Sequence, residues 1–255
     1  MIWRLRSILF NIFFYGNTFV LLGLCVPVLL LPKKWQRMVP AMWVGSTYWI
    51  EKHILGLDYI VIGRENLPPP PYIVAMKHQS AWETMKLYAL FGDPAIVLKK
   101  ELMDLPFWGN YARAMDMVPV DRSKGRQATA FMVESAKKIL VTKRPLVIFP
   151  QGTRVAVGTQ KPYKAGMSRL YNELNIPLVP VALNAGVFWP RNAFWKRPGR
   201  ITVQILPPIA PNKNPDDVQK EIETILETTS DKLCIQAVTQ HHLEKDFPQL
   251  ISSHV

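Results

Sequence analysis

The sequence has very little cysteine, which excludes two kinds of stabilised scaffold. Its two cysteines, Cys25 and Cys234, lie far apart, and Cys25 sits inside an apolar run. A disulfide framework or a cysteine zinc site needs several cysteines at short spacing. No other group of residues has the spacing of metal ligands. We therefore expect free thiols, a reducing compartment and no metal.

Acidic side chains are scarce relative to basic ones. The chain of 255 residues has 19 Asp and Glu against 31 Lys and Arg, a net charge of +12, and 49% of its residues are hydrophobic. That apolar content argues against disorder, and the length suits one large domain or one domain with an appendage. A basic surface favours nucleic acid, anionic lipid or phosphorylated small molecules as partners. Because there is no nucleic-acid recognition motif, repeat or long low-complexity tract, we expect no nucleic acid partner.

Charged residues are absent from the 24 residues 8–31, which basic residues flank on both sides. A signal peptide has a shorter apolar region and a small-residue cleavage site, so it fits poorly. A single transmembrane helix fits the length. A hairpin that enters one leaflet and returns through a second helix at 35–57 fits better, because polar residues and Pro27 interrupt the run and tryptophans suit an interface. We favour the hairpin, and both interpretations make residues 1–56 a membrane anchor.

Residues 57–255 have the pattern of an α/β domain, in which short apolar runs alternate with amphipathic segments. Asn214 as cap, Pro215 and two aspartates mark the start of the last long helix. The expected helices cover 81–91, 125–141, a segment ending at 174, and 215 onward. The expected strands cover 57–63, 72–77, 95–98, 117–120, 146–149, 178–183 and 201–206.

The segment Lys77 to Thr84 is the strongest candidate for catalysis. His78 follows a buried strand, and Glu83 comes five residues later, which suits a base and the acid that orients it. The alternative is structural, because Ser80 to Glu83 matches a helix capping box. The His78–Glu83 pair can meet only if His78 stays outside the helix and Glu83 lies in its first turn.

Cationic residues follow other expected strands. Ligands of open α/β sheets bind beyond the carboxyl ends of the strands, so these residues can share one cleft with His78. A base beside several cations suits a phosphorylated substrate with a hydroxyl to deprotonate. Taken singly, each cation is most simply a surface residue and Gly152 a turn residue. The strand-end residues are Lys99, Lys100, Arg122 and the loop Phe149-Pro150-Gln151-Gly152-Thr153-Arg154.

Taken together, four ordered motifs over residues 57–205 resemble the glycerolipid acyltransferases, specifically the lysophosphatidic acid acyltransferases. That family has His-x4-Asp, which His78 to Glu83 matches with Glu for Asp. Its third motif, Phe-Pro-Glu-Gly-Thr-Arg, is similar to Phe149 to Arg154 with Gln151 for Glu, and its Val-Pro-Val run is similar to 178–183. The second motif and a later Lys-x-Gly resemble Lys99-Lys100-Glu101-Leu102, Pro106, Gly109, Asp121-Arg122 and Lys164-Ala165-Gly166.

The resemblance implies a mixed, largely parallel sheet flanked by helices, and an enzyme that acylates the sn-2 hydroxyl of lysophosphatidate to give phosphatidate. His78 would be the general base and Glu83 would hold its tautomer. The donor would be acyl-CoA or an acyl carrier protein, with no cofactor. The alternatives are another lysolipid acceptor, such as a lyso-ornithine lipid or lysophospholipid, and a nonenzymatic lipid-binding protein. The expected substrate-binding residues are Lys99, Lys100, Arg122, Gln151, Gly152, Thr153 and Arg154.

Because substrate and product are lipids, we expect catalysis at an anionic membrane, with the catalytic domain facing the cytoplasm at a bacterial inner membrane. The segment 188–197 mixes aromatic and cationic residues. It has two interpretations of equal weight, a second membrane contact and a partly buried aromatic loop.

Overall fold

A single mixed sheet forms the centre of the molecule. The computed structural model describes residues 2–36, 38–105, 108–121 and 125–252. The sheet order is β1-β7-β6-β2-β5-β3-β4, and only the β6–β7 pairing among the described strands is antiparallel. All seven expected strands form, which confirms the predicted α/β class. Their bounds are β1 Leu57–Ile62, β2 Ile73–Met76, β3 Ala95–Lys99, β4 Val118–Val120, β5 Leu146–Ile148, β6 Leu178–Leu183 and β7 Gly199–Ile205.

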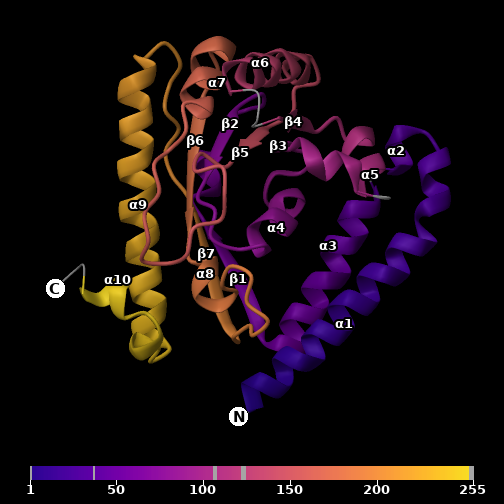
Figure 1. Ribbon diagram of the computed structural model, residues 1–255, viewed down its shortest axis with the longest axis vertical. Coiled ribbons are helices and arrows are strands. Elements are labelled where there is room, and N and C mark those ends of the chain that lie inside the picture. Colours follow the sequence, from indigo (N-terminus) through magenta and orange to yellow (C-terminus); the bar gives the residue numbers. More distant parts are fainter. Residues whose placement is uncertain (1, 37, 106–107, 122–124, 253–255) are drawn as a thin grey trace.

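Helices cover both faces of this sheet, which explains why its central strands are continuous apolar runs. Figure 1 shows α9 and α7 on one side and α4, α3 and α1 on the other. Their bounds are α1 Ile2–Leu24, α2 Lys33–Gln36, α3 Met38–Ile50, α4 Trp82–Phe91, α5 Trp108–Ala114, α6 Gly125–Val141, α7 Gly166–Leu174, α8 Ala185–Phe188, α9 Pro215–Gln240 and α10 Pro248–Ser252. Short helical turns are η1 Val26–Leu30, η2 Glu51–Leu55, η3 Arg64–Asn66, η4 Lys100–Asp104 and η6 Glu244–Asp246.

Strand β2 shows how the sheet divides the core. Ile73 and Ala75 pack with residues of α6, α7 and α9, whereas Val74 and Met76 pack with residues of α4 and the N-terminal helices. All four side chains are fully buried. The segment that carries His78 therefore leaves a fully buried strand, and the packing of that strand fixes where the histidine emerges.

The N-terminal helices form an antiparallel pair in which α1 and α3 lie side by side (Figure 1). The Asn17 amide donates to Ser46 Oγ at 2.9 Å, and the Trp43 indole donates to Thr18 Oγ1 at 3.0 Å. These polar residues interrupt the apolar run because they join the two helices. The helical pair predicted from the sequence is present, and its position relative to a bilayer stays a prediction.

Much of the apolar surface of this pair is exposed. Phe19 is 74% exposed, Leu24 70% and Ile12 62%. Within the described ranges, α1 is the one helix long and apolar enough to cross a membrane by length and composition. Arg4 lies against the rings of Trp3 and Trp195 at the start of α1, where an aromatic and cationic cluster suits an interface.

Helix α9 begins as the sequence predicts. The Asn214 side chain accepts hydrogen bonds from the amides of Asp216 and Asp217, and Pro215 is the first helical residue. The inner face of α9 buries Val218 and Leu226 along with several other side chains. This long helix therefore has a fixed start and packs along the sheet.

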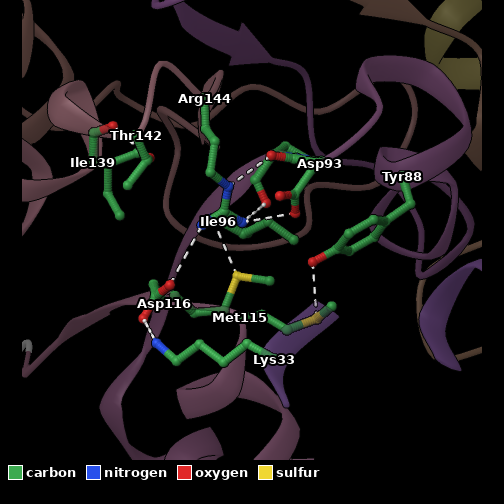
Figure 2. Close-up of polar contacts among 11 residues, drawn as sticks. Lys33, Tyr88, Asp93, Ile96, Met115, Asp116, Ile139, Thr142 and Arg144 are labelled. Carbon is green, nitrogen blue, oxygen red and sulfur yellow. Dashed lines mark hydrogen bonds and ion pairs between the residues drawn. The ribbon is translucent and has the colours of Figure 1, made fainter. Parts of the chain in front are cut away.

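A buried arginine ties together the chain around the beginnings of β3 and β4 (Figure 2). The Arg144 guanidinium, which is 5% exposed, donates to the Asp93 carbonyl and carboxylate at 2.9 Å and lies 3.8 Å from the Asp116 carboxylate. Asp116 also pairs with Lys33, which precedes α3. This network positions the strand that ends in Lys99 and attaches the N-terminal region to the edge of the sheet.

Candidate active site

A cleft of about 480 Å³ opens at the carboxyl ends of β2, β3 and β5. These strands are parallel, so their ends meet at one edge of the sheet. Of the residues expected from the sequence, five line this cleft: His78, Lys99, Gly152, Thr153 and Arg154. The structure therefore brings together side chains that lie up to 76 positions apart in the chain.

His78 and Glu83 are in direct contact. His78 Nδ1 lies 2.8 Å from Glu83 Oε1, and the glutamate side chain is fully buried while that of His78 is 13% exposed. His78 lies outside α4 and Glu83 lies in its first turn, which is the one arrangement that lets residues at this spacing meet. With Nδ1–H donating to the carboxylate, the lone pair of the neutral imidazole is at Nε2. In that tautomer, His78 can accept a proton at Nε2 from a group bound in the cleft.

Glu83 also serves as the cap that the sequence allows. Its Oε1 accepts from the amides of Gln79 at 2.8 Å and Ser80 at 2.7 Å. The reciprocal bond of the capping box is shifted, since Ser80 Oγ accepts from the Trp82 amide at 3.1 Å. One carboxylate oxygen therefore begins the helix and contacts the imidazole. The catalytic and structural interpretations of Glu83 are compatible.

The loop after β5 packs directly against His78. The Phe149 ring stacks on the imidazole with 4.0 Å between ring centroids, and the Val155 amide donates to the His78 carbonyl at 2.8 Å. Gly152 has φ +67°, as expected for a turn residue, and its amide donates to the Phe149 carbonyl. Since the turn uses the Gly152 amide, Thr153 offers the candidate backbone donor toward an anion.

Among the residues that the structure describes, four cationic side chains line the cleft. Lys99 and Arg154 were expected, whereas Lys164 and Arg191 were not predicted as site residues. Lys164 stands in the Lys-x-Gly motif, and that motif was the available signal. Arg191 comes from the loop 188–197 and had no signal of its own. Positive charge from four separate segments surrounds one cavity, which favours an anionic group there.

Two described residues that were expected to bind substrate do not line the cleft. Lys100 points to Asp121 in an exposed ion pair of 3.4 Å, because η4 begins at this residue and turns it away from Lys99. Gln151 is 2% exposed and donates to Glu227 Oε1 at 3.2 Å on the side of α9. Arg122 lies outside the described residues.

The loop 188–197 has buried and exposed aromatic residues, and its contact with a membrane stays a prediction. Trp189 is 6% exposed and belongs to the core, as the buried interpretation requires, while Phe194 is 55% exposed. The Lys196 ammonium is buried and donates to Asn11 Oδ1 at 2.8 Å, so α1 binds the loop that brings Arg191 to the cleft. Burial lowers the pKa of Lys196 to about 8.

Much of the remaining cleft surface is apolar. It comes from β3, α6 and the start of α7, which place Leu98, Ala128, Met132 and Met167 along the cavity. In the part of the chain that the structure describes, no three His, Cys, Asp or Glu residues are grouped as metal ligands. The cleft therefore offers a base, cations and an apolar wall.

Comparison with known proteins gives a consistent result. The family model described as Acyltransferase matches residues 58–184. The chain is 32% identical to a 1-acyl-sn-glycerol-3-phosphate acyltransferase of Pseudomonas aeruginosa over 80% of both proteins. It is 32% identical to the Saccharomyces cerevisiae protein of the same name, over 76% of this chain and 66% of that one.

The fold is also similar to a solved structure. The crystal structure of the 1-acyl-sn-glycerophosphate (LPA) acyltransferase PlsC from Thermotoga maritima matches with a TM-score of 0.72. The match covers 90% of this chain and 98% of that one at 20% identity, so it supports the fold. The chain belongs to the 1-acyl-sn-glycerol-3-phosphate acyltransferase family.

Proposed function

We propose that this protein transfers an acyl group from a thioester donor to the sn-2 hydroxyl of lysophosphatidate, which gives phosphatidate. The observation that carries this proposal is the 2.8 Å His78–Glu83 contact inside a cleft lined by four cations. A base beside concentrated positive charge suits a substrate that has both a hydroxyl and a phosphate. The names of the relatives from Pseudomonas aeruginosa and Saccharomyces cerevisiae support the same acceptor.

His78 activates the acceptor hydroxyl. Its Nε2 removes the hydroxyl proton as the oxygen forms a bond to the thioester carbonyl carbon. Glu83 holds the tautomer through Nδ1 and stabilises the imidazolium that forms. The tetrahedral intermediate then collapses, the carbon–sulfur bond breaks, and the thiolate takes a proton from the imidazolium or from water. The substrate hydroxyl is itself the nucleophile, so no acyl-enzyme is formed.

The phosphate binds among Lys99, Arg154, Lys164 and Arg191. Arg154 is the best placed of these to bind substrate because it is only partly exposed and belongs to the loop that packs on His78. Hydrogen bonds between charged groups strengthen when water is restricted. The Thr153 amide adds a neutral donor, to the phosphate or to the developing oxyanion.

The acyl chains contact the apolar wall of the cleft. Leu98, Met132 and Met167 provide a surface on which a hydrocarbon chain loses contact with water. The donor is acyl-CoA or an acyl carrier protein, and both carry negative charge that the basic chain attracts, with its net charge of +12.

The protein acts at a membrane through its helical pair. The exposed side chains of α1 and α3 include Phe19, Leu24 and Met42, and such a surface is stabilised by lipid. We place the pair in one leaflet as a hairpin, with the catalytic domain on the cytoplasmic side of a bacterial inner membrane. The contact between α1 and the loop 188–197 keeps the cleft close to that surface.

The acceptor is tested with the full-length protein in bilayer nanodiscs. Lysophosphatidate, lysophosphatidylethanolamine, lysophosphatidylcholine and a lyso-ornithine lipid are each offered with acyl-CoA and with acyl carrier protein. We expect kcat/KM for lysophosphatidate to exceed that of each other acceptor at least about tenfold, since one charge-assisted hydrogen bond is worth that much. Preference for a lysolipid without a phosphomonoester would overturn the assignment.

A further inference from the structure

A buried polar cluster lies directly behind the cleft. The Glu227 carboxylate of α9 accepts from Lys77 Nζ at 2.5 Å, from the Tyr163 hydroxyl at 2.8 Å and from Gln151 Nε2 at 3.2 Å. The Lys77 side chain is 3% exposed and that of Glu227 is 13% exposed. A charge pair this well buried requires good geometry, because each charge has lost most of its hydration.

The three partners of Glu227 share one relation to the cleft. Each immediately precedes a residue that lines it: Lys77 precedes His78, Gln151 precedes Gly152, and Tyr163 precedes Lys164. One carboxylate therefore holds three separate segments that bring the base, the turn with Arg154 and a cation to the same cavity. Burial and the neighbouring Glu227 carboxylate raise the pKa of Tyr163, so its hydroxyl stays protonated and donates.

Helix α9 also contacts the residue on the other side of His78. The side-chain amide of Gln79 donates through Nε2 to Cys234 Sγ at 3.5 Å. Its Oε1 accepts from the backbone amide of Gly186 at 3.0 Å. Both neighbours of His78 thus point toward α9 and α8, while His78 lines the cleft. Of the two sets of contacts, the set made by Glu227 includes a charged pair and joins more segments of the chain than the set made by Gln79.

The amide at position 151 is complementary to the carboxylate at position 227. Gln151 donates to Glu227, whereas a glutamate at 151 would place a second carboxylate against the first, with Lys77 as the ammonium bound to the pair. The motif that this loop resembles has glutamate at that position. Gln151 and Glu227 are therefore a matched pair in which the negative charge comes from α9 and the hydrogen-bond donor from the loop.

We propose that Glu227 is a positioning residue of the active site, which sets the separation of the His78 and Arg154 segments and carries the carboxylate that position 151 lacks. This inference rests on the proposed function, in that the segments it positions are those of the acyl transfer site. It predicts that the charge is transferable, so that a carboxylate at 151 and an amide at 227 serve in place of the native pair.

The test is a double-mutant cycle with Glu227→Gln, Gln151→Glu and the double variant, in full-length protein. We expect each single change to lower kcat/KM about tenfold, since Glu227→Gln removes the carboxylate that Lys77 contacts and Gln151→Glu opposes two carboxylates. The double variant restores a single carboxylate beside Lys77 and should return to within about threefold of the wild type. Glu221→Gln is the matched control, because Glu221 is an exposed residue of the same helix, paired with Lys213.

A second measurement needs no substrate and separates this inference from the proposed function. The rate at which diethyl pyrocarbonate modifies His78, followed by mass spectrometry, should change at least about threefold in each single variant and recover in the double. If the wild type were inactive on every lysolipid, the proposed function would be wrong. The positioning role would still hold if the reactivity of His78 changed in the single variants and recovered in the double variant. A double variant no better than the worse single, in both rate and reactivity, would overturn the role of Glu227.

Discussion

The cleft and the helical pair expose and bury opposite kinds of side chain. At the cleft, Glu83 and Gln151 are polar and almost fully buried, and each has hydrogen-bond partners within the chain. On the helical pair, Phe19 and Leu24 are large, apolar and mostly exposed. The buried polar side chains at the cleft make their hydrogen bonds within the chain, although Glu83 Oε2 has no hydrogen-bond partner among the described residues, whereas the apolar side chains of the helical pair are left for lipid to cover. The composition of the cleft therefore suits a reaction, and that of the helical pair suits attachment to a membrane.

The two regions meet at the helix that carries Glu83. Glu51, which follows α3, accepts from the Trp82 indole at 3.2 Å and pairs with Lys86 at 2.8 Å. Trp82 and Lys86 both belong to α4, so the chain directly after α3 contacts the helix that carries Glu83. The two regions thus differ in composition but are in direct contact. Substitutions confined to one region can test whether their functions are separate.

His78→Ala should produce the largest effect. Loss of the general base is expected to lower kcat/KM about 10³-fold, while the apolar surface of α1 and α3 stays intact. Acyl transfer and sedimentation with anionic liposomes are measured on the same preparation. Unchanged acyl transfer would remove the mechanism and favour a lipid-binding protein, and a parallel loss of liposome binding would contradict the separation of the two regions.

Charges on the exposed face of α1 should produce the converse result. The double variant Ile12→Asp, Phe19→Asp replaces two apolar side chains that would contact lipid. Each replacement should cost about 2 kcal/mol of binding free energy, so liposome binding should weaken at least about 100-fold. Activity on micellar lysophosphatidate should stay within about threefold of the wild type. Val141→Asp is the control, since this residue is 85% exposed on α6, away from the pair. Equal binding losses in the control and the α1 variant would show that any added charge suffices.

Glu83→Gln separates the two tasks of one carboxylate. The amide oxygen can still accept from the amides of Gln79 and Ser80, so we expect the melting temperature to change by a few degrees at most. The loss of negative charge beside the imidazole should lower kcat about 100-fold. A near-native kcat would instead mean that Glu83 acts mainly as a cap.

Replacing a cation that lines the cleft should affect the kinetics more than replacing a neighbouring cation outside the cleft. Arg154→Ala removes a charge that lines the cavity and should raise KM for lysophosphatidate about tenfold. Lys100→Ala removes a charge that is exposed beside Asp121, so its effect should stay under about twofold. Steady-state kinetics of the two variants measures this difference. Equal effects would indicate general electrostatic attraction instead of a defined phosphate site.

The sequence predicts the residues that line the cleft better than it predicts the contacts that hold them in place. His78, Glu83 and the Phe149 loop stand in short motifs next to apolar strands, and local patterns of that kind identify them. The outcomes for Lys99 and Lys100 depend on where η4 begins, which two adjacent lysines do not reveal. The boundary of an element is set by packing and is poorly encoded in a short pattern.

Long-range partners had no sequence signal at all. Glu227 lies 150 positions after Lys77, on a helix face where a charged residue is ordinarily assigned to solvent. The pairing of Asn11 with Lys196 spans 185 positions and is hidden by the apolar character of α1. Such contacts arise from the topology of the sheet and the docking of helices on it, so they become visible only in three dimensions.

Lys196→Met tests the contact that joins the two regions, with the smallest expected effect. The pKa of Lys196 is about 8 in the folded protein and 10.5 for an ordinary lysine. Between these values the unfolded chain binds more protons, so the wild type gains stability as pH rises from 8 to 10. Methionine cannot titrate, and the stability difference between wild type and variant should therefore grow in favour of the wild type by roughly 1–2 kcal/mol over that range. Melting temperatures recorded at pH 7.5 and pH 10 measure the change, and parallel shifts in the two proteins would show that the ammonium between α1 and the loop 188–197 is not held out of water.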